Sequence, residues 1–223
     1  MKSVILRILR AHPSEKPYYE EFDVPFNEKT TILDCLHHVK DNSDRTLSFR
    51  DTCRSGICGA CGVMVNNKAY LACKTSVVEV ASDVLVIEPL RHFPVIKDLM
   101  VDFDEFFEKL KEVNPWILTD SPQDKVMDQE TVLRIRKIGH CVYCGVCYAE
   151  SNLVEKDKNF VGPHAVAKVA RYLQDPREKS EERVRIAKGL YQFVTVNEEE
   201  WDLPCPTDID FQEVQRIVKE AVR

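Results

Sequence analysis

The first ninety residues alternate apolar and polar positions as half-buried strands do. Residues 2–10 and 18–24 are predicted to be paired strands, joined by a loop that contains prolines. A helix is predicted over 31–41, because Thr31 can cap its start and an apolar face follows. A hairpin is expected around Asn66-Asn67, and a last strand over 84–88. This half of the chain is therefore predicted to be strand-rich.

From about residue 95 the pattern becomes helical. Phe103, Phe106 and Leu110 share one face of a predicted helix, and Pro163 suits the first position of another. A final helix is expected after Asp210. Three further expectations concern polar segments and the halves of the chain: a surface loop over 119–130, a solvated helix over 177–189, and two domains, 1–95 and 96–223. The predicted fold class is α+β.

Composition and charge exclude several classes of function. The chain has 223 residues and a net charge of −6, which makes binding to a nucleic-acid backbone a poor explanation. No stretch approaches the roughly 18 consecutive apolar residues of a membrane span. The first ten residues do not have the layout of a signal peptide. Nine cysteines in tight spacings, without a secretory signal, favour metal sites over disulfides.

The first cysteine set has the C-x4-C-x2-C…C spacing of plant-type [2Fe-2S] proteins. Glycines within this loop allow the backbone to turn its N–H groups towards a cluster. A zinc site is the alternative, although zinc sites favour two C-x2-C pairs. The predicted [2Fe-2S] ligands are Cys53, Cys58, Cys61 and Cys73.

The second set is a C-x2-C-x2-C run with a distant Cys-Pro. Three such cysteines suit three corners of a cubane, and the distant cysteine suits the fourth. A [3Fe-4S] cluster on three of them, or zinc, are the alternatives. The predicted [4Fe-4S] ligands are Cys141, Cys144, Cys147 and Cys205. Cys35, the ninth cysteine, is expected to be a small core residue.

Five separated segments carry a resemblance to the iron–sulfur subunits of succinate dehydrogenase and fumarate reductase. The segments are 51–75, 86–102, 141–151, 160–178 and 205–210. The resemblance implies an N-terminal plant-ferredoxin-like β-grasp domain and a C-terminal helical domain like bacterial ferredoxins. It also implies docking on a catalytic subunit that contains FAD, and a [3Fe-4S] cluster near a quinone and a membrane anchor.

This sequence departs from the family at the third cluster. The resemblance places that cluster's three ligands at Ser151, Thr195 and Trp201, and none of these is a cysteine. Serine has a far higher pKa than a thiol, and tryptophan cannot ligate iron. One [2Fe-2S] and one [4Fe-4S] cluster are therefore expected, and no [3Fe-4S] cluster.

The expected function is that of a non-catalytic electron-transfer subunit in a complex of the succinate dehydrogenase/fumarate reductase type. It would relay single electrons between the partner's FAD and a quinone or another acceptor, and no catalytic residue is expected in this chain. The alternatives are a stand-alone two-cluster ferredoxin, or a subunit of a related flavoenzyme with a soluble acceptor. The expected location is cytoplasmic, or peripheral on the inner face of a membrane through partner subunits. A membrane-anchor subunit or a soluble electron-acceptor subunit is the expected further partner.

Overall fold

The structure is a computed structural model that describes residues 2–119, 126–178 and 181–223. It forms two compact units. The first contains residues up to Phe103 together with Val142–Glu150, and the second contains Asp104–Cys141 and Ser151–Arg223. The expected domains 1–95 and 96–223 are a different division of the chain and stay a prediction.

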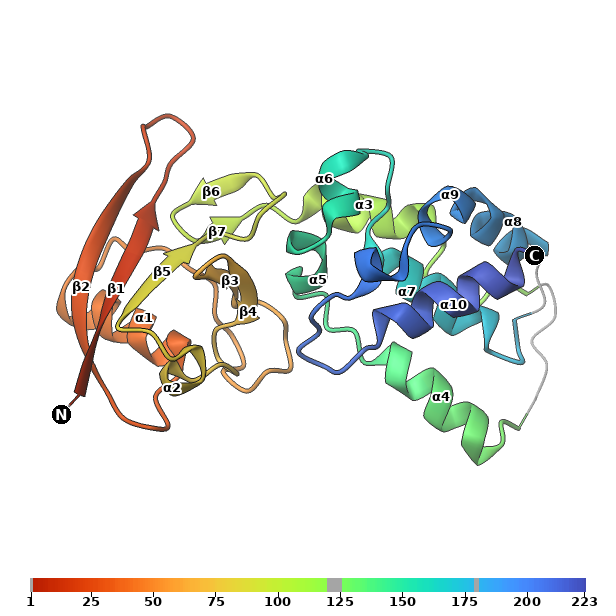
Figure 1. Cartoon of the computed structure of the whole chain (residues 1–223), viewed down its shortest axis with the longest axis horizontal. Helices are drawn as coiled ribbons and strands as arrows, with labels where there is room; N and C mark the ends of the chain where they lie inside the picture. Colours follow the sequence, from red (N-terminus) through yellow and green to blue (C-terminus); the bar gives the residue numbers. More distant parts are fainter. Residues whose placement is uncertain (1, 120–125, 179–180) are drawn as a thin grey trace. The chain divides into compact units, whose positions relative to one another are not determined.

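The first unit is built on a five-stranded mixed sheet (Figure 1). Its first two strands form an antiparallel pair, and its first and fifth strands run parallel. In spatial order the strands are β2 (Tyr18–Phe26), β1 (Lys2–Arg10), β5 (Val84–Glu88), β3 (Gly62–Val65) and β4 (Lys68–Leu71).

Alternation along β1 buries one side of that strand, with Val4, Leu6 and Ile8 all inside. Helix α1 (Ile32–Asn42) begins at Thr31, whose side chain forms a reciprocal capping box with Asp34. Asn66 and Asn67 both have positive φ in the turn of the β3–β4 hairpin. The shorter elements of this unit are α2 (Val77–Val80), β6 (Val95–Lys97), β7 (Met100–Val101) and α5 (Val146–Ala149).

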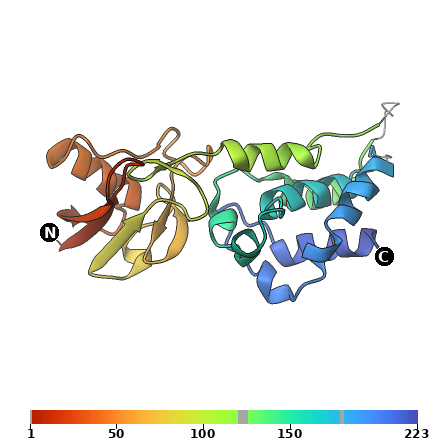
Figure 2. The ribbon, with the colours of Figure 1, turned by 90° about the horizontal axis from the view of Figure 1, so that it is seen from above.

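The second unit is helical, and α7 (Pro163–Leu173) is its centre (Figure 2). Pro163 opens α7, as predicted. The apolar side chains of α7 are buried against several other helices of the unit. Those other elements are α3 (Asp104–Glu112), α4 (Gln129–Gly139), α6 (Asn152–Lys156), α8 (Glu181–Gly189), α9 (Tyr191–Val194), the 3-10 turn η1 (Glu198–Trp201) and α10 (Phe211–Ala221).

The α+β prediction is confirmed, but three local expectations were incomplete. Phe103, which was expected on the same helix face as Phe106 and Leu110, directly precedes α3. Residues 129 and 130 begin α4 instead of ending the predicted loop, and positions 120–125 of that loop lie outside the described residues. The charged helix α8 is not wholly solvated, because Arg183 is buried. Its guanidinium donates hydrogen bonds to the carbonyls of Val113, Asn114 and Trp116, at 2.6, 2.8 and 2.7 Å. Positions 179 and 180 also lie outside the described residues.

Candidate functional site

The loop from Cys53 to Cys61 turns by means of left-handed residues. Arg54, Gly56 and Gly59 all have positive φ, at 55°, 74° and 73°. Glycine adopts this conformation without the steric cost that a side chain adds. The repeated reversal turns the backbone N–H groups of the loop inwards, which gives the cysteines donors from their own loop.

Three of the four sulfurs in the first set accept hydrogen bonds from backbone N–H groups. Cys53 Sγ accepts from the N–H groups of Ser55, Ile57 and Cys58 at 3.4, 3.3 and 3.3 Å. Cys73 Sγ accepts from Gly56 at 3.2 Å, and Cys61 Sγ accepts from the N–H of Cys73 at 3.4 Å. Donors aimed at sulfur stabilise negative charge, which is what thiolate ligands of iron carry.

The surroundings shift the pKa values of two of these thiols in opposite directions. The hydrogen bonds from Ser55 and then from Cys58 and Ile57 lower the pKa of Cys53 to about 6. Burial raises the pKa of Cys61 to about 12, because a thiolate loses its solvation there. A buried thiol becomes a thiolate readily only when a metal replaces its proton, so Cys61 suits a ligand better than a free nucleophile.

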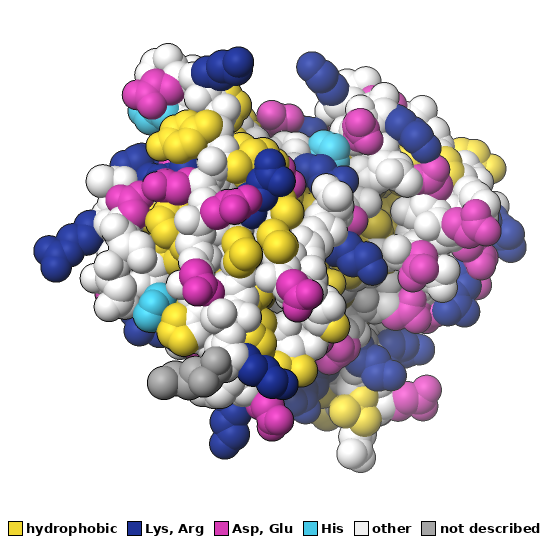
Figure 3. Space-filling model, turned by 60° about the vertical axis from the view of Figure 1, so that its left-hand side comes forward, with side chains coloured by type: hydrophobic (Ala, Val, Ile, Leu, Met, Phe, Trp, Pro, Cys, Tyr) yellow, Lys and Arg dark blue, Asp and Glu magenta, His cyan; other side chains and the backbone are white. Residues whose placement is uncertain are grey.

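One side of the first loop lies open to solvent. Ile57 is 70 % exposed, and Cys58 is exposed as well. Arg54 projects from the loop and its Nε donates to Asp51 at 3.0 Å, while Asp51 also bonds His37 at 2.8 Å. On the face of the molecule in Figure 3, apolar side chains at the surface lie among charges of both signs. The loop is therefore accessible to a partner, and Arg54 has a fixed anionic neighbour.

Two cysteines of the second set belong to the first unit. Cys144 and Cys147 are buried on either side of Gly145, whose φ is 78°. A Cβ on Gly145 would meet Phe93 at 3.0 Å and Leu90 at 3.1 Å. Close packing against these two side chains, together with the left-handed turn, fixes the path of the chain between the two cysteines.

The structure brings the two cysteine loops into direct contact within this unit. A Cβ on Gly59 would lie 2.2 Å from the carbonyl oxygen of Val142, and one on Gly62 would lie 2.7 Å from that of Cys144. These contacts admit only glycine without movement of the backbone. Nothing in the sequence pattern signals the contact, because the two segments are more than 80 residues apart.

The other two cysteines of the second set, Cys141 and Cys205, belong to the second unit and are half-buried. Cys205 Sγ lies 3.3 Å from Thr207 Oγ1, a contact that the cysteine spacing did not predict. His140 is exposed and accepts a hydrogen bond from Arg136 Nε at 3.2 Å. In the described part of the chain, no three His, Cys, Asp or Glu side chains gather to hold a single ion. A [2Fe-2S] cluster takes two thiolates on each iron and a [4Fe-4S] cluster takes one on each, so no three of these sulfurs need to meet at one ion.

The residues at the expected third-cluster positions do not fit an iron–sulfur cluster. Trp201 is 1 % exposed, and its Nε1 donates to the Phe193 carbonyl at 3.2 Å. Thr195 donates its hydroxyl to the Tyr191 carbonyl at 2.9 Å. Ser151 is 1 % exposed, and its Oγ has no partner among the described residues. The three side chains offer no thiolate, and two of them already make protein hydrogen bonds.

Cys35 is buried in α1, as the sequence predicted. Burial raises the pKa of this thiol to about 12. It therefore behaves as a small core residue. Among the described residues, no helix is both long enough and apolar enough to cross a membrane.

Comparisons with known proteins agree with the geometry. Residues 5–108 match the model of a 2Fe-2S iron–sulfur cluster binding domain. The fumarate reductase iron–sulfur subunit of Mycobacterium tuberculosis is 31 % identical over 94 % of this chain and 89 % of that protein. The corresponding subunit of Escherichia coli O6:H1 is 35 % identical over 80 % of this chain and 75 % of that protein.

A solved structure shows the same fold. A chain of the Mycobacterium smegmatis Sdh1 complex in the apo form superposes with a TM-score of 0.86 and 24 % identity. The match covers 99 % of this chain and 95 % of that one. The curated relatives confirm the predicted resemblance: the chain belongs to the family of fumarate reductase iron–sulfur subunits, which are electron-transfer subunits of complexes of the succinate dehydrogenase/fumarate reductase type.

Proposed function

We propose that this subunit carries two clusters and no third. Cys53, Cys58, Cys61 and Cys73 hold a [2Fe-2S] cluster, and Cys141, Cys144, Cys147 and Cys205 hold a [4Fe-4S] cluster. When bound, the clusters accept and pass on single electrons. The chain's own residues supply the thiolates, donate N–H groups to sulfur and keep the two cysteine loops together.

The observation that carries this proposal is the contact between the loops. Gly59 of the first loop and Gly62, the first residue of β3, lie directly against Val142 and Cys144 of the second loop. Electron relay needs neighbouring cofactors held at a fixed separation, and this contact supports such an arrangement. The chain itself performs no bond chemistry in this scheme.

The partner at the [2Fe-2S] end is proposed to be a catalytic subunit that contains FAD. The exposed Ile57 and Cys58 make the loop accessible to such a subunit. The partner's flavin would exchange a hydride with a dicarboxylate, and this chain would divide the electron pair into single-electron steps. A membrane-anchor subunit, and through it a peripheral position on the inner face of a membrane, stays a prediction.

A second candidate concerns only the acceptor. Ser151, Thr195 and Trp201 provide no ligands for a third cluster, so the route would end at the [4Fe-4S] cluster. We propose that the acceptor there differs from a quinone in the family's usual position, and that it is a soluble carrier or an unusual membrane partner. Efficient quinone reduction by the assembled complex would refute this second candidate and leave the two-cluster proposal standing.

The decisive experiment is anaerobic purification with iron and sulfide analysis and EPR. About six irons per chain are expected, from one two-iron and one four-iron cluster. Cys73→Ala should remove the [2Fe-2S] signal, Cys205→Ala should remove the [4Fe-4S] signal, and Cys35→Ala should leave both unchanged. A stoichiometric [3Fe-4S] signal in anaerobically prepared protein would contradict the proposal.

A further inference from the structure

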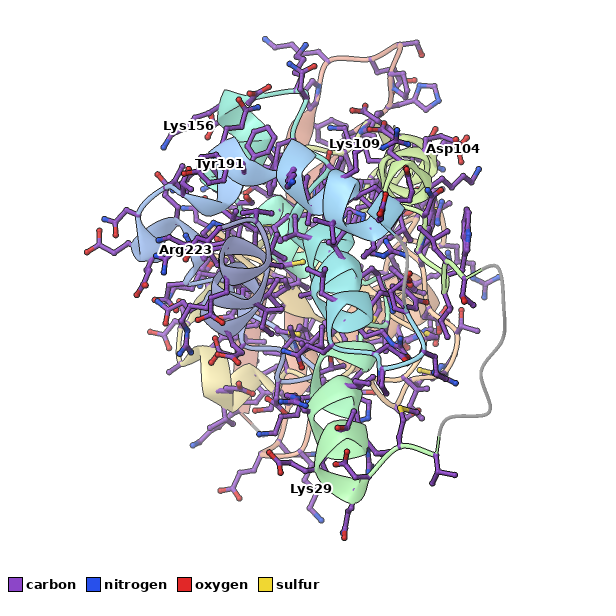
Figure 4. The ribbon with its side chains drawn as sticks, turned by 90° about the vertical axis from the view of Figure 1, so that its right-hand side faces the viewer. Lys29, Asp104, Lys109, Lys156, Tyr191 and Arg223 are labelled. Atoms are coloured by element: carbon purple, nitrogen blue, oxygen red, sulfur yellow. The ribbon has the colours of Figure 1, made fainter. Side chains whose placement is uncertain are left out.

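Helices α4 and α10 both pack on α7 in the second unit and leave an open groove of about 850 Å³ between them. In Figure 4, Arg223 marks the end of the chain just beyond α10. The apolar residues that line this α4–α10 groove are Leu133, Ile138 and Ile217. Nothing in the described relay of electrons uses this groove.

The two walls of the groove carry opposite net charges. The α4 wall presents Arg134, Arg136 and Lys137, with the acidic Glu130 at its N-terminal end. The wall at the start of α10 presents Asp208, Asp210 and Glu213. The contacts of these groups lie on their own wall, since Arg136 bonds His140 and Glu213 pairs with Arg216. The groove therefore offers apolar residues between a basic edge and an acidic edge.

Helix α4 exposes more apolar surface than its packing needs. Only Thr131, Ile135 and Ile138 of this helix are buried. Leu133 is 49 % exposed and its neighbour Val132 is 42 % exposed. An apolar strip with charged borders is the usual composition of a site that receives an amphipathic helix.

The groove also borders two of the proposed cluster ligands. Thr207 lines it, and Thr207 Oγ1 is 3.3 Å from Cys205 Sγ. His140, which also lines it, directly precedes Cys141. A molecule seated here would therefore be separated from a ligand sulfur by a single threonine side chain.

We propose that the α4–α10 groove receives an amphipathic helix of the protein that exchanges electrons with the [4Fe-4S] cluster. That helix presents an apolar stripe to Leu133 and Ile217, acidic side chains to the α4 wall, and basic side chains to the α10 wall. The inference rests on the two-cluster function proposed above, and it names the kind of partner that serves the second cluster.

The probe is a synthetic helical peptide of about 18 residues, or about five turns. It has a leucine stripe with glutamates along one edge and lysines along the other. The control is a second peptide with the same leucine stripe, in which the glutamates and the lysines have exchanged edges. Binding to the full-length holoprotein is measured by fluorescence anisotropy, with a nitroxide on the peptide for EPR.

The matched peptide should bind at least about tenfold more tightly than the exchanged one. Leu133→Asp and the double change Arg134→Glu/Lys137→Glu should each weaken the matched peptide by about tenfold or more. Val184→Asp on α8, which is 37 % exposed, is the apolar control and should change nothing. The reduced [4Fe-4S] cluster should relax the bound nitroxide more strongly than the [2Fe-2S] cluster does.

Several results would overturn the inference. The first is that the two peptides bind equally well or not at all. The second is that Leu133→Asp and Val184→Asp have equal effects. The third is that light scattering shows a dimer that Leu133→Asp dissociates. The last result would identify a second copy of the chain as the occupant. Iron content and EPR of each variant are measured in parallel. If both clusters are intact and the groove variants do not change peptide binding, only this inference is refuted. If the clusters are missing, the proposed function is refuted.

Discussion

Replacing Gly59 by alanine adds one carbon at the contact between the two cysteine loops. That carbon would sit 2.2 Å from the Val142 carbonyl oxygen. Since Cβ contacts below 3.0 Å essentially never occur, one of the loops has to retreat by at least 0.8 Å. Gly56→Ala is the matched control, because its φ of 74° is almost that of Gly59 and its new carbon would meet only the flexible Lys74 side chain, at 3.5 Å.

Both variants lose stability through backbone strain, and only Gly59→Ala also loses stability through overpacking. A left-handed alanine costs about 1–2 kcal/mol at either position. Overpacking adds about 1–3 kcal/mol at Gly59 only. Gly56→Ala should therefore lose about 1–2 kcal/mol and Gly59→Ala about 2–5 kcal/mol. The extra loss at Gly59 should appear as damage to the second cysteine loop, which holds Cys144.

The assay is iron per chain, with EPR of both clusters and the half-life of cluster absorbance on warming. We expect Gly56→Ala to keep both clusters, and Gly59→Ala to lose or perturb the [4Fe-4S] cluster. Gly139→Ala, whose added carbon meets nothing within 4 Å, should resemble the wild type. If Gly59→Ala matched Gly56→Ala in both clusters, the inferred contact between the loops would be refuted.

Three further predictions concern other parts of the chain. Burial lowers the pKa of His164 to about 3, so between pH 6.5 and pH 3 only the unfolded chain binds a proton at this side chain. The free energy of unfolding should therefore fall by up to about 1.4 kcal/mol per pH unit as the pH drops through this range. In urea unfolding, His164→Phe should make this dependence on pH less steep. Trp201→Ala should cost about 3–5 kcal/mol in the same measurement without changing iron content, and a loss of iron would contradict its structural role. Ile57→Asp should weaken binding of the flavoprotein subunit by about tenfold in a pull-down titration and leave both clusters intact. Val78→Asp, at a side chain 50 % exposed, is its control, and equal effects of the two would argue against docking at the loop.

The sequence was most informative where the chemistry is local. The spacing Cys53-x4-Cys58-x2-Cys61 predicts a loop that wraps around a cluster, because consecutive ligands must come from one short turn. The structure adds N–H donors to three sulfurs of the first set, which spacing alone does not reveal. The contact of Gly59 with Val142 was not predictable, because it joins distant segments through backbone atoms and leaves no hydrophobic pattern.

Helix α4 shows a second reason why a sequence pattern can fail to predict an element. Asp128 caps it by accepting from the N–H of Thr131, and Thr131, Ile135 and Ile138 are buried at the spacing i, i+4, i+7. That signal is obscured by Val132 and Leu133, which place apolar side chains on the exposed side of the same helix. Exposed apolar residues break the rule that apolar residues face the core, so such a helix is hard to recognise from one chain.

The segment that lacks third-cluster ligands raises the question of what holds it in place. A bound metal contributes folding free energy, so a segment without one must be held by protein contacts. Here Phe160 lies 4.8 Å from Phe193 and 6.1 Å from Trp201, centroid to centroid. Buried Gln215 donates to the carbonyls of Val194 and Val196, at 3.1 and 2.9 Å.

Aromatic packing fills the apolar part of the segment, and the Gln215 amide satisfies the carbonyls of Val194 and Val196, whereas the buried Ser151 Oγ and Gln215 Oε1 have no partner among the described residues. Restoring three thiols as Ser151→Cys, Thr195→Cys and Trp201→Cys would therefore remove a buried indole that is part of the core. We expect the triple variant to be less stable than the wild type before any iron is offered, as apoprotein unfolding would show. If its stability were unchanged, Trp201 would be incidental, and the segment's independence of metal would need another cause.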